Sequence, residues 1–470
     1  MNITHISAEC YPIAKVGGLA DVVGALPKYL NSKITKAQVI MPFYNNSFTN
    51  SNTFKSVFKS KIKLGNQDVA FNIKTLVNNT LDFNIYFIDI PEFLFKEYVY
   101  SSNDTERFLA FQIAALDWLL SQDTKPDVIH CHDHHTGLIP FMLQESCKYN
   151  ILNNIPNVFT IHNAQYQGSF SHDNMNLIPE FNFGKVGLLD WNGQINPLAA
   201  AIKCAWAVTT VSPSYMAELT TKANGLETLL KAEQQKCYGI LNGIDWKVWN
   251  PETDSFIVEN YTIKTAQKGR LENKKYLCDK FNLDINKPLF GFIGRLVYEK
   301  GSDIFPDTFK QSLTSKNHTV LLLGSGDKKQ EEAFINLKNN NEGLYNTFIG
   351  YNEALSHIVY AGADFLLMPS RVEPCGLNQM YALRYGTIPI VRSTGGLKDT
   401  VIDMALPNGF GFCHENVEPQ EIINNINRAV KLYNNKKEFN NVRKKIMNID
   451  HSWDASAKEY IKLYNSLNQI

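Results

Sequence analysis

The chain has 470 residues, more than one hydrophobic core usually serves, so two domains are expected. Its 46 basic and 46 acidic residues cancel, which leaves no long-range attraction to nucleic acid or to an anionic membrane. No run approaches the roughly 20 apolar residues of a membrane helix, and the start lacks the pattern of a signal peptide, so we expect a cytoplasmic protein with no membrane or nucleic-acid partner.

Two series of short apolar runs alternate with helical stretches along the chain. This alternation is typical of an α/β fold with parallel sheets. A less regular section, 47–90, has period-two stretches such as Phe83–Ile88 and is expected to supply antiparallel edge strands. The predicted parallel strands are Ile3–Ser7, Gln38–Met41, Val128–Cys131, Val158–Ile161 and Ala207–Val211 in the first series, and Leu289–Gly294, Val320–Gly324, Phe365–Pro369 and Ile388–Val391 in the second.

The domain boundary is expected where turn residues cluster between the two series, around Leu241–Asp245. This gives an N-terminal domain of residues 1–243 and a C-terminal domain of residues 244–450. In the remaining segment, 451–470, aromatic and apolar residues recur at helical spacing. The segment is therefore predicted to form a helix that packs back on the domains.

The pattern Gly-Gly-Leu-X-Asp-X-Val occurs twice, at Gly17–Val23 and at Gly395–Val401. Each copy follows an apolar run and is predicted to open an amphipathic helix, whose free N–H groups and positive dipole end suit a phosphate. We therefore expect both turns to face one anionic ligand. The alternative is a coincidence between two ordinary strand-to-helix turns.

The residues that follow the predicted strands are unusually polar. Ligands of open parallel sheets bind beyond the carboxyl ends of the strands, so these residues are candidates for a functional site. They are His132, Asp133, His134 and His135 after one strand of the first series, His162 and Asn163 after the next, Arg295 and Lys300 after the first strand of the second series, and Ser370, Arg371 and Glu373 after its third strand.

The run His130–His135 contains residue types that bind metal ions, but the sequence does not favour a metal site. In a strand, His130 and His132 share one face while Cys131 points to the other, and no second ligand cluster is evident. The eight cysteines are far apart in sequence and form no Cys-X-X-Cys pair, which indicates reduced thiols. Asp133 is assigned to a sugar hydroxyl, because a carboxylate accepts two such hydrogen bonds.

Arg295 and Lys300 are two cations five residues apart at a predicted strand end. They suit a diphosphate leaving group, because fixed cations stabilise the charge that develops on it; the alternative is a solvated pair in a loop. Glu373 either contacts a sugar near the reacting carbon or is an acid favoured by a helix N-terminus. Residues 324–329 lack the third glycine of a dinucleotide fingerprint, so nicotinamide is not expected, and no pair of carboxylates suggests a hydrolase.

Seven motifs, in order and spacing over essentially the whole chain, resemble those of bacterial glycogen synthases and plant starch synthases. The resemblance implies a GT-B glycosyltransferase, with two Rossmann-like, doubly wound α/β domains facing across a cleft. It also implies transfer of glucose from ADP-glucose, a nucleotide sugar, to the non-reducing 4-hydroxyl of an α-1,4-glucan such as glycogen, with retention at the anomeric carbon and no metal or other cofactor. The motifs are Lys15–Val22, His132–Leu138, Phe159–Asn163, Leu241–Asp245, Gly294–Leu296 with Lys300–Gly301, Ser370–Leu377 and Ser393–Leu397.

The resemblance also implies roles for single residues. Catalytic roles fall to Arg295 and Lys300 on the diphosphate, to Glu373 near the transferred glucose, and to His162, whose backbone lies near the anomeric carbon. Tyr351 occupies a position where the family often stacks an aromatic ring on the base. The other implied substrate-binding residues are Lys15, Gly17, Gly18, Asp21, Asp133, Asn163, Asn242, Cys375, Gly376, Leu377, Thr394, Gly395 and Gly396.

Two positions depart from the family pattern. Val16 stands where threonine is usual, and His134 where tryptophan is frequent. Neither change removes a charged contact, but the second leaves the donor and acceptor preferences open. The alternatives are a glucan synthase that uses UDP-glucose, a nucleotide-sugar epimerase of the same fold, and an inactive glucan-binding protein. Retention of the diphosphate cations counts against the last.

Overall fold

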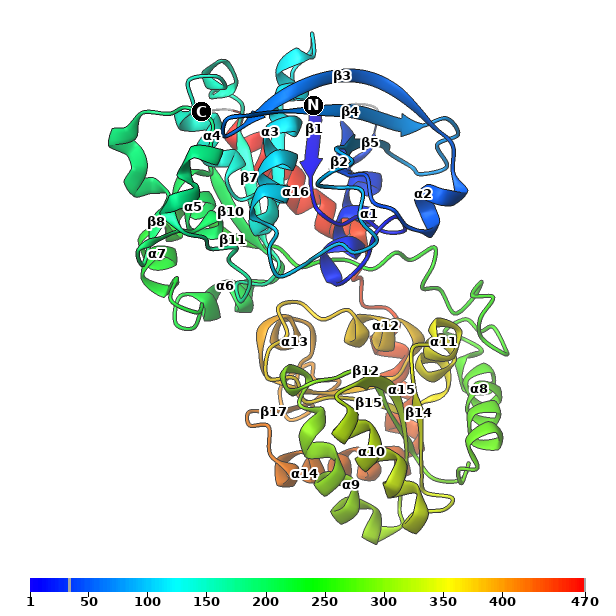
Figure 1. Cartoon of the computed structure of the whole chain (residues 1–470). Helices are drawn as coiled ribbons and strands as arrows, with labels where there is room; N and C mark the ends of the chain where they lie inside the picture. Colours follow the sequence, from blue (N-terminus) through cyan, green and yellow to red (C-terminus); the bar gives the residue numbers. More distant parts are fainter. Residues whose placement is uncertain (33–34, 469–470) are drawn as a thin grey trace. The chain divides into compact units, whose positions relative to one another are not determined.

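The computed structural model describes residues 1–32 and 35–468, which divide into two compact α/β units (Figure 1). Unit 1 comprises Met1–Leu241 and the segment from Trp453 onward, and unit 2 comprises Asn242–Ser452. The change of unit after Leu241 falls within the cluster of turn residues where a boundary is expected. The last two residues of the predicted C-terminal segment lie outside the described residues. Within the described ranges, no helix is both long and apolar enough to span a membrane.

Unit 1 is built on a nine-stranded sheet with the order β11-β10-β7-β6-β1-β2-β5-β4-β3. The strands from β11 to β5 run parallel, whereas β4 pairs antiparallel with both β5 and β3, which confirms the expected antiparallel edge. These strands, with the separate hairpin β8-β9, are β1 (Asn2–Ile6), β2 (Lys36–Pro42), β3 (Phe54–Leu64), β4 (Gln67–Leu76), β5 (Asn84–Asp89), β6 (Val128–His132), β7 (Asn157–Ile161), β8 (Asp190–Trp191), β9 (Gln194–Ile195), β10 (Ala207–Thr210) and β11 (Cys237–Gly239).

The C-terminal helix α16, red in Figure 1, packs with α1 on the sheet of unit 1. Val22 and Leu26 of α1 share a buried cluster with Tyr460 and Tyr464 of α16 and with Val128 of β6. Burial of such a stripe holds an amphipathic helix in place. The helices of unit 1 are α1 (Gly18–Leu30), α2 (Ser47–Ser51), α3 (Thr105–Ser121), α4 (Ile139–Glu145), α5 (Pro197–Cys204), α6 (Pro213–Leu219), α7 (Glu227–Ala232) and α16 (Trp453–Leu467).

Unit 2 has a six-stranded, all-parallel sheet with the order β14-β13-β12-β15-β16-β17. Helices lie along this sheet, and its apolar strand residues fill the core. The strands are β12 (Leu289–Leu296), β13 (Thr319–Gly326), β14 (Tyr345–Ile349), β15 (Phe365–Met368), β16 (Ile388–Arg392) and β17 (Phe412–His414), and the helices are α8 (Ala266–Phe281), α9 (Phe305–Ser312), α10 (Lys328–Asn336), α11 (Glu353–Gly362), α12 (Asn378–Tyr385), α13 (Gly395–Thr400), α14 (Pro419–Asn434) and α15 (Lys436–Ile446).

Each parallel region has a switch point at which the strand order reverses. In unit 1, β1 lies between β2 and β6, and in unit 2, β12 lies between β13 and β15. Ligands of open α/β sheets bind beyond the carboxyl ends of the strands at such a switch point. The first glycine loop and His132–Asp133 follow β1 and β6, while Arg295 and Ser370–Glu373 lie at the ends of β12 and β15. The topology therefore gathers the predicted residues of each unit at its switch point.

Candidate active site

The first glycine loop is held by a buried carboxylate that the sequence did not reveal. Glu9, shortly after β1, accepts hydrogen bonds from the backbone N–H groups of Val16 and Gly17 and from the Tyr100 hydroxyl. Burial raises the pKa of Glu9, and these three donors oppose that shift. The Gly17 N–H thus binds Glu9, so the prediction that it is free for a phosphate is wrong.

Lys15 and Asp21, both predicted to bind substrate, form an ion pair beside this loop. Lys15 Nζ lies 2.7 Å from Asp21 Oδ1. Asp21 belongs to the first turn of α1, where the helix dipole favours a carboxylate. A Cβ built on Gly17 or Gly18 would meet no heavy atom of the described chain within 4 Å. The pair therefore fixes a partly exposed ammonium group next to two glycines that leave open space.

The second glycine turn has a different physical role. Gly395 has a φ of 45°, and a Cβ there would lie 2.1 Å from the carbonyl oxygen of Glu373. A Cβ on Gly396 would lie 2.1 Å from the carbonyl oxygen of Cys375. The helix α13 has only six residues, because Val401 already has extended dihedral angles. A helix therefore begins at the second glycine turn as predicted, although it is short, and its two glycines pack closely on the Glu373–Cys375 turn.

Asp133 joins the ends of β6 and β7. Its carboxylate accepts hydrogen bonds from the backbone N–H groups of His162, at 2.8 Å, and Asn163. Burial raises the pKa of Asp133 to about 7, against the effect of these bonds. The Asn163 side chain accepts a bond from the Gln165 N–H and so shapes the same loop. The structure thus brings together the predicted Asp133, His162 and Asn163.

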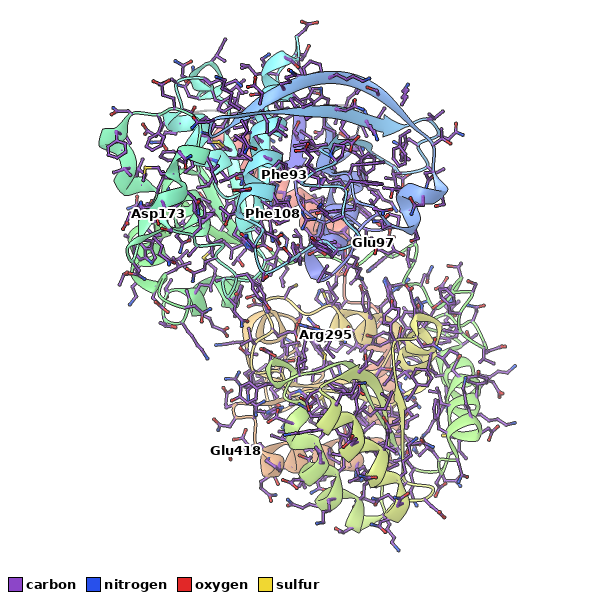
Figure 2. The ribbon with its side chains drawn as sticks, viewed as in Figure 1. Phe93, Glu97, Phe108, Asp173, Arg295 and Glu418 are labelled. Carbon is purple, nitrogen blue, oxygen red and sulfur yellow. The ribbon has the colours of Figure 1, made fainter. Side chains whose placement is uncertain are left out.

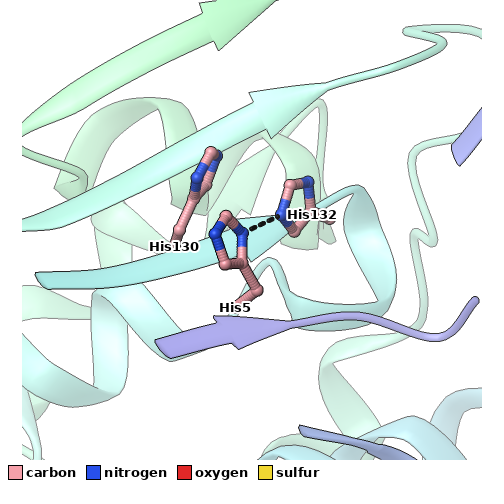
Figure 3. A group of neighbouring side chains, drawn as sticks. All are labelled: His5, His130 and His132. Carbon is pink, nitrogen blue, oxygen red and sulfur yellow. Dashed lines mark hydrogen bonds between the residues drawn. The ribbon is translucent and has the colours of Figure 1, made fainter. Parts of the chain in front are cut away.

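A third histidine joins the run that suggested metal ligands. His5 of β1 pairs in register with His130 of β6, and His5, His130 and His132 offer ring nitrogens within 4.8 Å of one another (Figure 3). His5 is not among the candidate ligands that the sequence indicates. Both nitrogens of His130 bond hydroxyl groups, and both of His132 bond other histidines. A metal ion would have to break these bonds, so the cluster is better described as a hydrogen-bonded network.

Arg295, labelled in Figure 2, carries an unpaired charge at the switch point of unit 2. The strand β12 extends to Leu296, two residues beyond the prediction, because β13 continues beside it and pairs Arg295 with Ser325. The side chain is exposed, and its guanidinium makes no hydrogen bond or ion pair with any residue that the structure describes. Such a group is available to an anionic ligand.

The second predicted cation, Lys300, is paired. Its Nζ lies 2.7 Å from Oε1 and 2.6 Å from Oε2 of the buried Glu373, and the Ser370 hydroxyl donates to Oε2 at 2.9 Å. Lys300 ends a short 3-10 turn after β12, while Glu373 follows β15. The ends of the neighbouring strands β12 and β15 therefore hold the Lys300 ammonium group in a fixed position, and β12 also carries the guanidinium of Arg295.

The predicted residues around Cys375 lie at the start of α12. The Asn242 backbone donates to the Cys375 thiol, whose pKa burial raises to about 12. Asn242 Oδ1 is buried and has no hydrogen-bond partner among the described residues. Gly376 has a φ of 72°, and Leu377 is the N-cap of α12. Asn242 therefore lies against the turn that contains Glu373 and Cys375.

The last two predicted residues differ in exposure. Thr394 is buried as the N-cap of α13. Tyr351 follows β14 and is 83% exposed, with its hydroxyl 3.5 Å from Glu353 Oε2. An aromatic ring this exposed has a face accessible for stacking, as its predicted role requires.

Comparison with known proteins gives matches over both units. The family model described as the starch synthase catalytic domain matches residues 2–232, and the model described as glycosyl transferases group 1 matches residues 274–446. A glycogen synthase of Flavobacterium johnsoniae is 51% identical over 472 residues, covering 100% of both chains. A glycogen synthase of Fervidobacterium nodosum is 38% identical over 99% of this chain and 98% of its own.

Solved structures show the same similarity. The catalytic domain of starch synthase IV from Arabidopsis thaliana, bound to ADP and acarbose, superposes with a TM-score of 0.89 at 31% identity, covering 100% of this chain and 99% of the other. A sucrose-phosphate synthase from Thermosynechococcus elongatus, 17% identical, superposes with a TM-score of 0.64 over 99% and 98% of the two chains and shares the fold.

Proposed function

The chain belongs to the family of bacterial glycogen synthases and starch synthases, which are GT-B glycosyltransferases, and we propose that its donor is ADP-glucose and its acceptor the non-reducing 4-hydroxyl of an α-1,4-glucan. The choice of ADP-glucose is supported by the starch synthase IV structure, which is similar over the whole chain and contains ADP. The relatives named as glycogen synthases support the glucan acceptor and give no support to an epimerase.

The unpaired guanidinium of Arg295 is the observation that carries this proposal. We assign Arg295 and Lys300 to the diphosphate of the donor. Negative charge accumulates on the leaving phosphate as its bond to the sugar breaks, and cations already in place stabilise it without reorganisation. The ion pair with Glu373 holds Lys300 in one position before the donor binds.

The residues of unit 1 are assigned to the transferred glucose. The Asp133 carboxylate fixes the backbone of His162 and Asn163, so the loop after β7 is rigid where the family resemblance puts the anomeric carbon. In the proposed reaction, the bond from the anomeric carbon to the phosphate breaks, and the glucan 4-hydroxyl forms the new bond on the same face. Its proton passes to the departing phosphate, so atoms and charge balance without a cofactor.

The proposed location is the cytoplasm. All eight cysteines are free thiols, and five of them are buried: Cys10, Cys131, Cys204, Cys278 and Cys375. Free thiols are the usual state in a reducing compartment.

The test is transfer of labelled glucose to glycogen from ADP-glucose and, in parallel, from UDP-glucose. We expect ADP-glucose to give the higher kcat/KM. A preference for UDP-glucose would overturn the donor assignment. Incubation of each donor without glucan provides the control for an epimerase, since an isomerised sugar nucleotide would then appear.

A further inference from the structure

Three histidines form a continuous chain of hydrogen bonds that ends at the candidate active site. His5 Nδ1 lies 3.0 Å from His132 Nε2, drawn as the dashed line in Figure 3, and His132 Nδ1 lies 3.0 Å from His162 Nε2. The residues come from β1, from β6 and from the position after β7, which are neighbours in the sheet. The chain therefore runs across the strand ends to the loop that Asp133 holds.

All three rings are neutral at physiological pH. Burial lowers the pKa of His5 and of His162 to about 3, and it lowers the pKa of His132 well below its ordinary value. A neutral imidazole carries one proton, so it donates through one nitrogen and accepts through the other. His132 bonds a histidine on each side, so it accepts from one and donates to the other. Both hydrogen bonds among the three histidines are therefore donated in the same direction, either toward His5 or toward His162.

The two ends of the chain differ, and this difference selects the direction. His5 Nε2 is buried without a hydrogen-bond partner among the described residues. If the chain pointed toward His5, this atom would carry an orphaned N–H, and orphaned buried N–H groups are rarer than unused acceptors. If it points toward His162, the unpartnered atom of His5 is a lone pair, and the proton of His162 lies on Nδ1.

We propose that His5 and His132 are positioning residues that hold His162 as the tautomer protonated on Nδ1, so that this N–H donates a hydrogen bond to an oxygen of the transferred sugar. The sugar contact rests on the proposed function, whereas the tautomer does not. His162 is 8% exposed, and its Nδ1 atom makes no hydrogen bond with any residue in the described ranges 1–32 and 35–468. A donor fixed beforehand in this way costs no reorganisation during the reaction.

His130 provides a matched control from the same cluster. Its ring centroid lies 4.8 Å from that of His5 and 4.3 Å from that of His132. Its nitrogens, however, bond Tyr464 and Thr160 and take no part in the chain. A His130→Gln variant therefore disturbs the packing around the chain without interrupting it.

The direct test is nitrogen NMR of the full-length protein labelled with 15N-histidine, with His162 assigned from the spectrum of a His162→Gln variant. The chemical shifts report which ring nitrogen carries the proton. We expect Nδ1–H for His162 in the wild type and in His130→Gln. An Nε2–H tautomer in the wild type would overturn the proposal. This measurement needs no substrate, so it tests the tautomer independently of the activity. If His162 carries its proton on Nδ1 but the protein transfers no glucose, the proposed function is contradicted and the tautomer assignment stands.

The kinetic test uses two replacements of His132. In His132→Asn the side-chain amide lies near the position of Nδ1 and can still donate to His162, whereas His132→Leu offers no donor. We expect kcat to fall about tenfold or more in His132→Leu, as for loss of one transition-state hydrogen bond, and to recover largely in His132→Asn. Equal losses in the two variants, or the same loss in His130→Gln, would show a merely structural role and overturn the proposal.

Discussion

The Lys300 ammonium group lies against both carboxylate oxygens of Glu373, at 2.7 and 2.6 Å. The backbone carbonyl of Glu373 accepts a hydrogen bond from the Gly396 N–H at 3.2 Å. One residue therefore connects a proposed diphosphate cation to the second glycine turn. The position of the charge therefore depends on the packing of that turn, which gives these glycines a structural role in the site.

The ion pair predicts the effect of Glu373→Gln. The amide keeps the shape of the side chain but no longer fixes Lys300 by charge, so we expect kcat to fall about a hundredfold, the scale of losing one preorganised electrostatic contact. Steady-state kinetics with ADP-glucose and glycogen measure this. Asp284→Asn, which removes the charge from the Asp284–Lys287 pair of the same unit, is the control and should keep kcat. Wild-type kcat in folded Glu373→Gln would contradict the role of the pair.

Arg295→Ala should separate activity from stability. Since the guanidinium has no partner within the described part of the chain, its loss should leave the Tm unchanged, while kcat falls by about 10² to 10³-fold. Arg428→Ala should lower the Tm and leave kcat unchanged, because Arg428 pairs with Asp403 at 2.6 Å. Paired measurements of Tm and kcat on both variants check this. A stability loss without a kinetic effect in Arg295→Ala would refute the assignment.

The two glycine turns should respond differently to alanine. Gly395→Ala places a Cβ 2.1 Å from the Glu373 carbonyl oxygen at a φ of 45°, so we expect the free energy of unfolding to fall by about 2 kcal/mol or more. Gly18→Ala meets open space within the described residues and begins α1, so its free energy of unfolding should be unchanged or slightly higher. Urea unfolding measures both. Similar losses would contradict the difference between the turns.

Asp133 predicts a pH dependence of stability. Its pKa of about 7 in the folded protein is above its ordinary value, so the folded state binds this proton more tightly than the unfolded state. The Asp133 proton therefore contributes to the free energy of unfolding at low pH, and this contribution is lost as the pH rises toward 7. Asp133→Asn cannot ionise at this position. The free energy of unfolding of the variant, relative to that of the wild type, should therefore be higher at pH 8 than at pH 5.5. Urea unfolding at both values tests this, and a difference that does not change with pH would count against it.

The sequence predicts the parts of the site that depend on local patterns. Apolar runs that end in polar residues correctly indicate that His162 follows β7 and that Asp133 follows β6. Parallel strands then bring their carboxyl ends to one edge of the sheet. The strand β14 escapes prediction because Asn346 and Thr347 interrupt its apolar pattern. The helix α13 ends at Thr400, although Val401 continues the apolar spacing, because Val401 has extended dihedral angles.

The contacts that escape prediction join residues far apart in the sequence. Tyr100 and Glu9 are 91 positions apart, and His5 and His132 are 127 positions apart. His5 lies within an apolar strand, where nothing in the local pattern marks it as a neighbour of the histidine run. Only the register of β1 against β6 places it there. The difference between the two glycine turns has the same origin, because only the second turn packs against residues 373–375.

The central claim is retaining transfer of glucose from ADP-glucose to a glucan, and the product tests it most directly. Proton NMR and linkage analysis of short glucans extended with labelled ADP-glucose identify the new bond. The account predicts an α-1,4 linkage at the non-reducing end, formed by the wild type and nearly absent in Arg295→Ala. A β linkage, or wild-type amounts of α-1,4 product from folded Arg295→Ala, would contradict it.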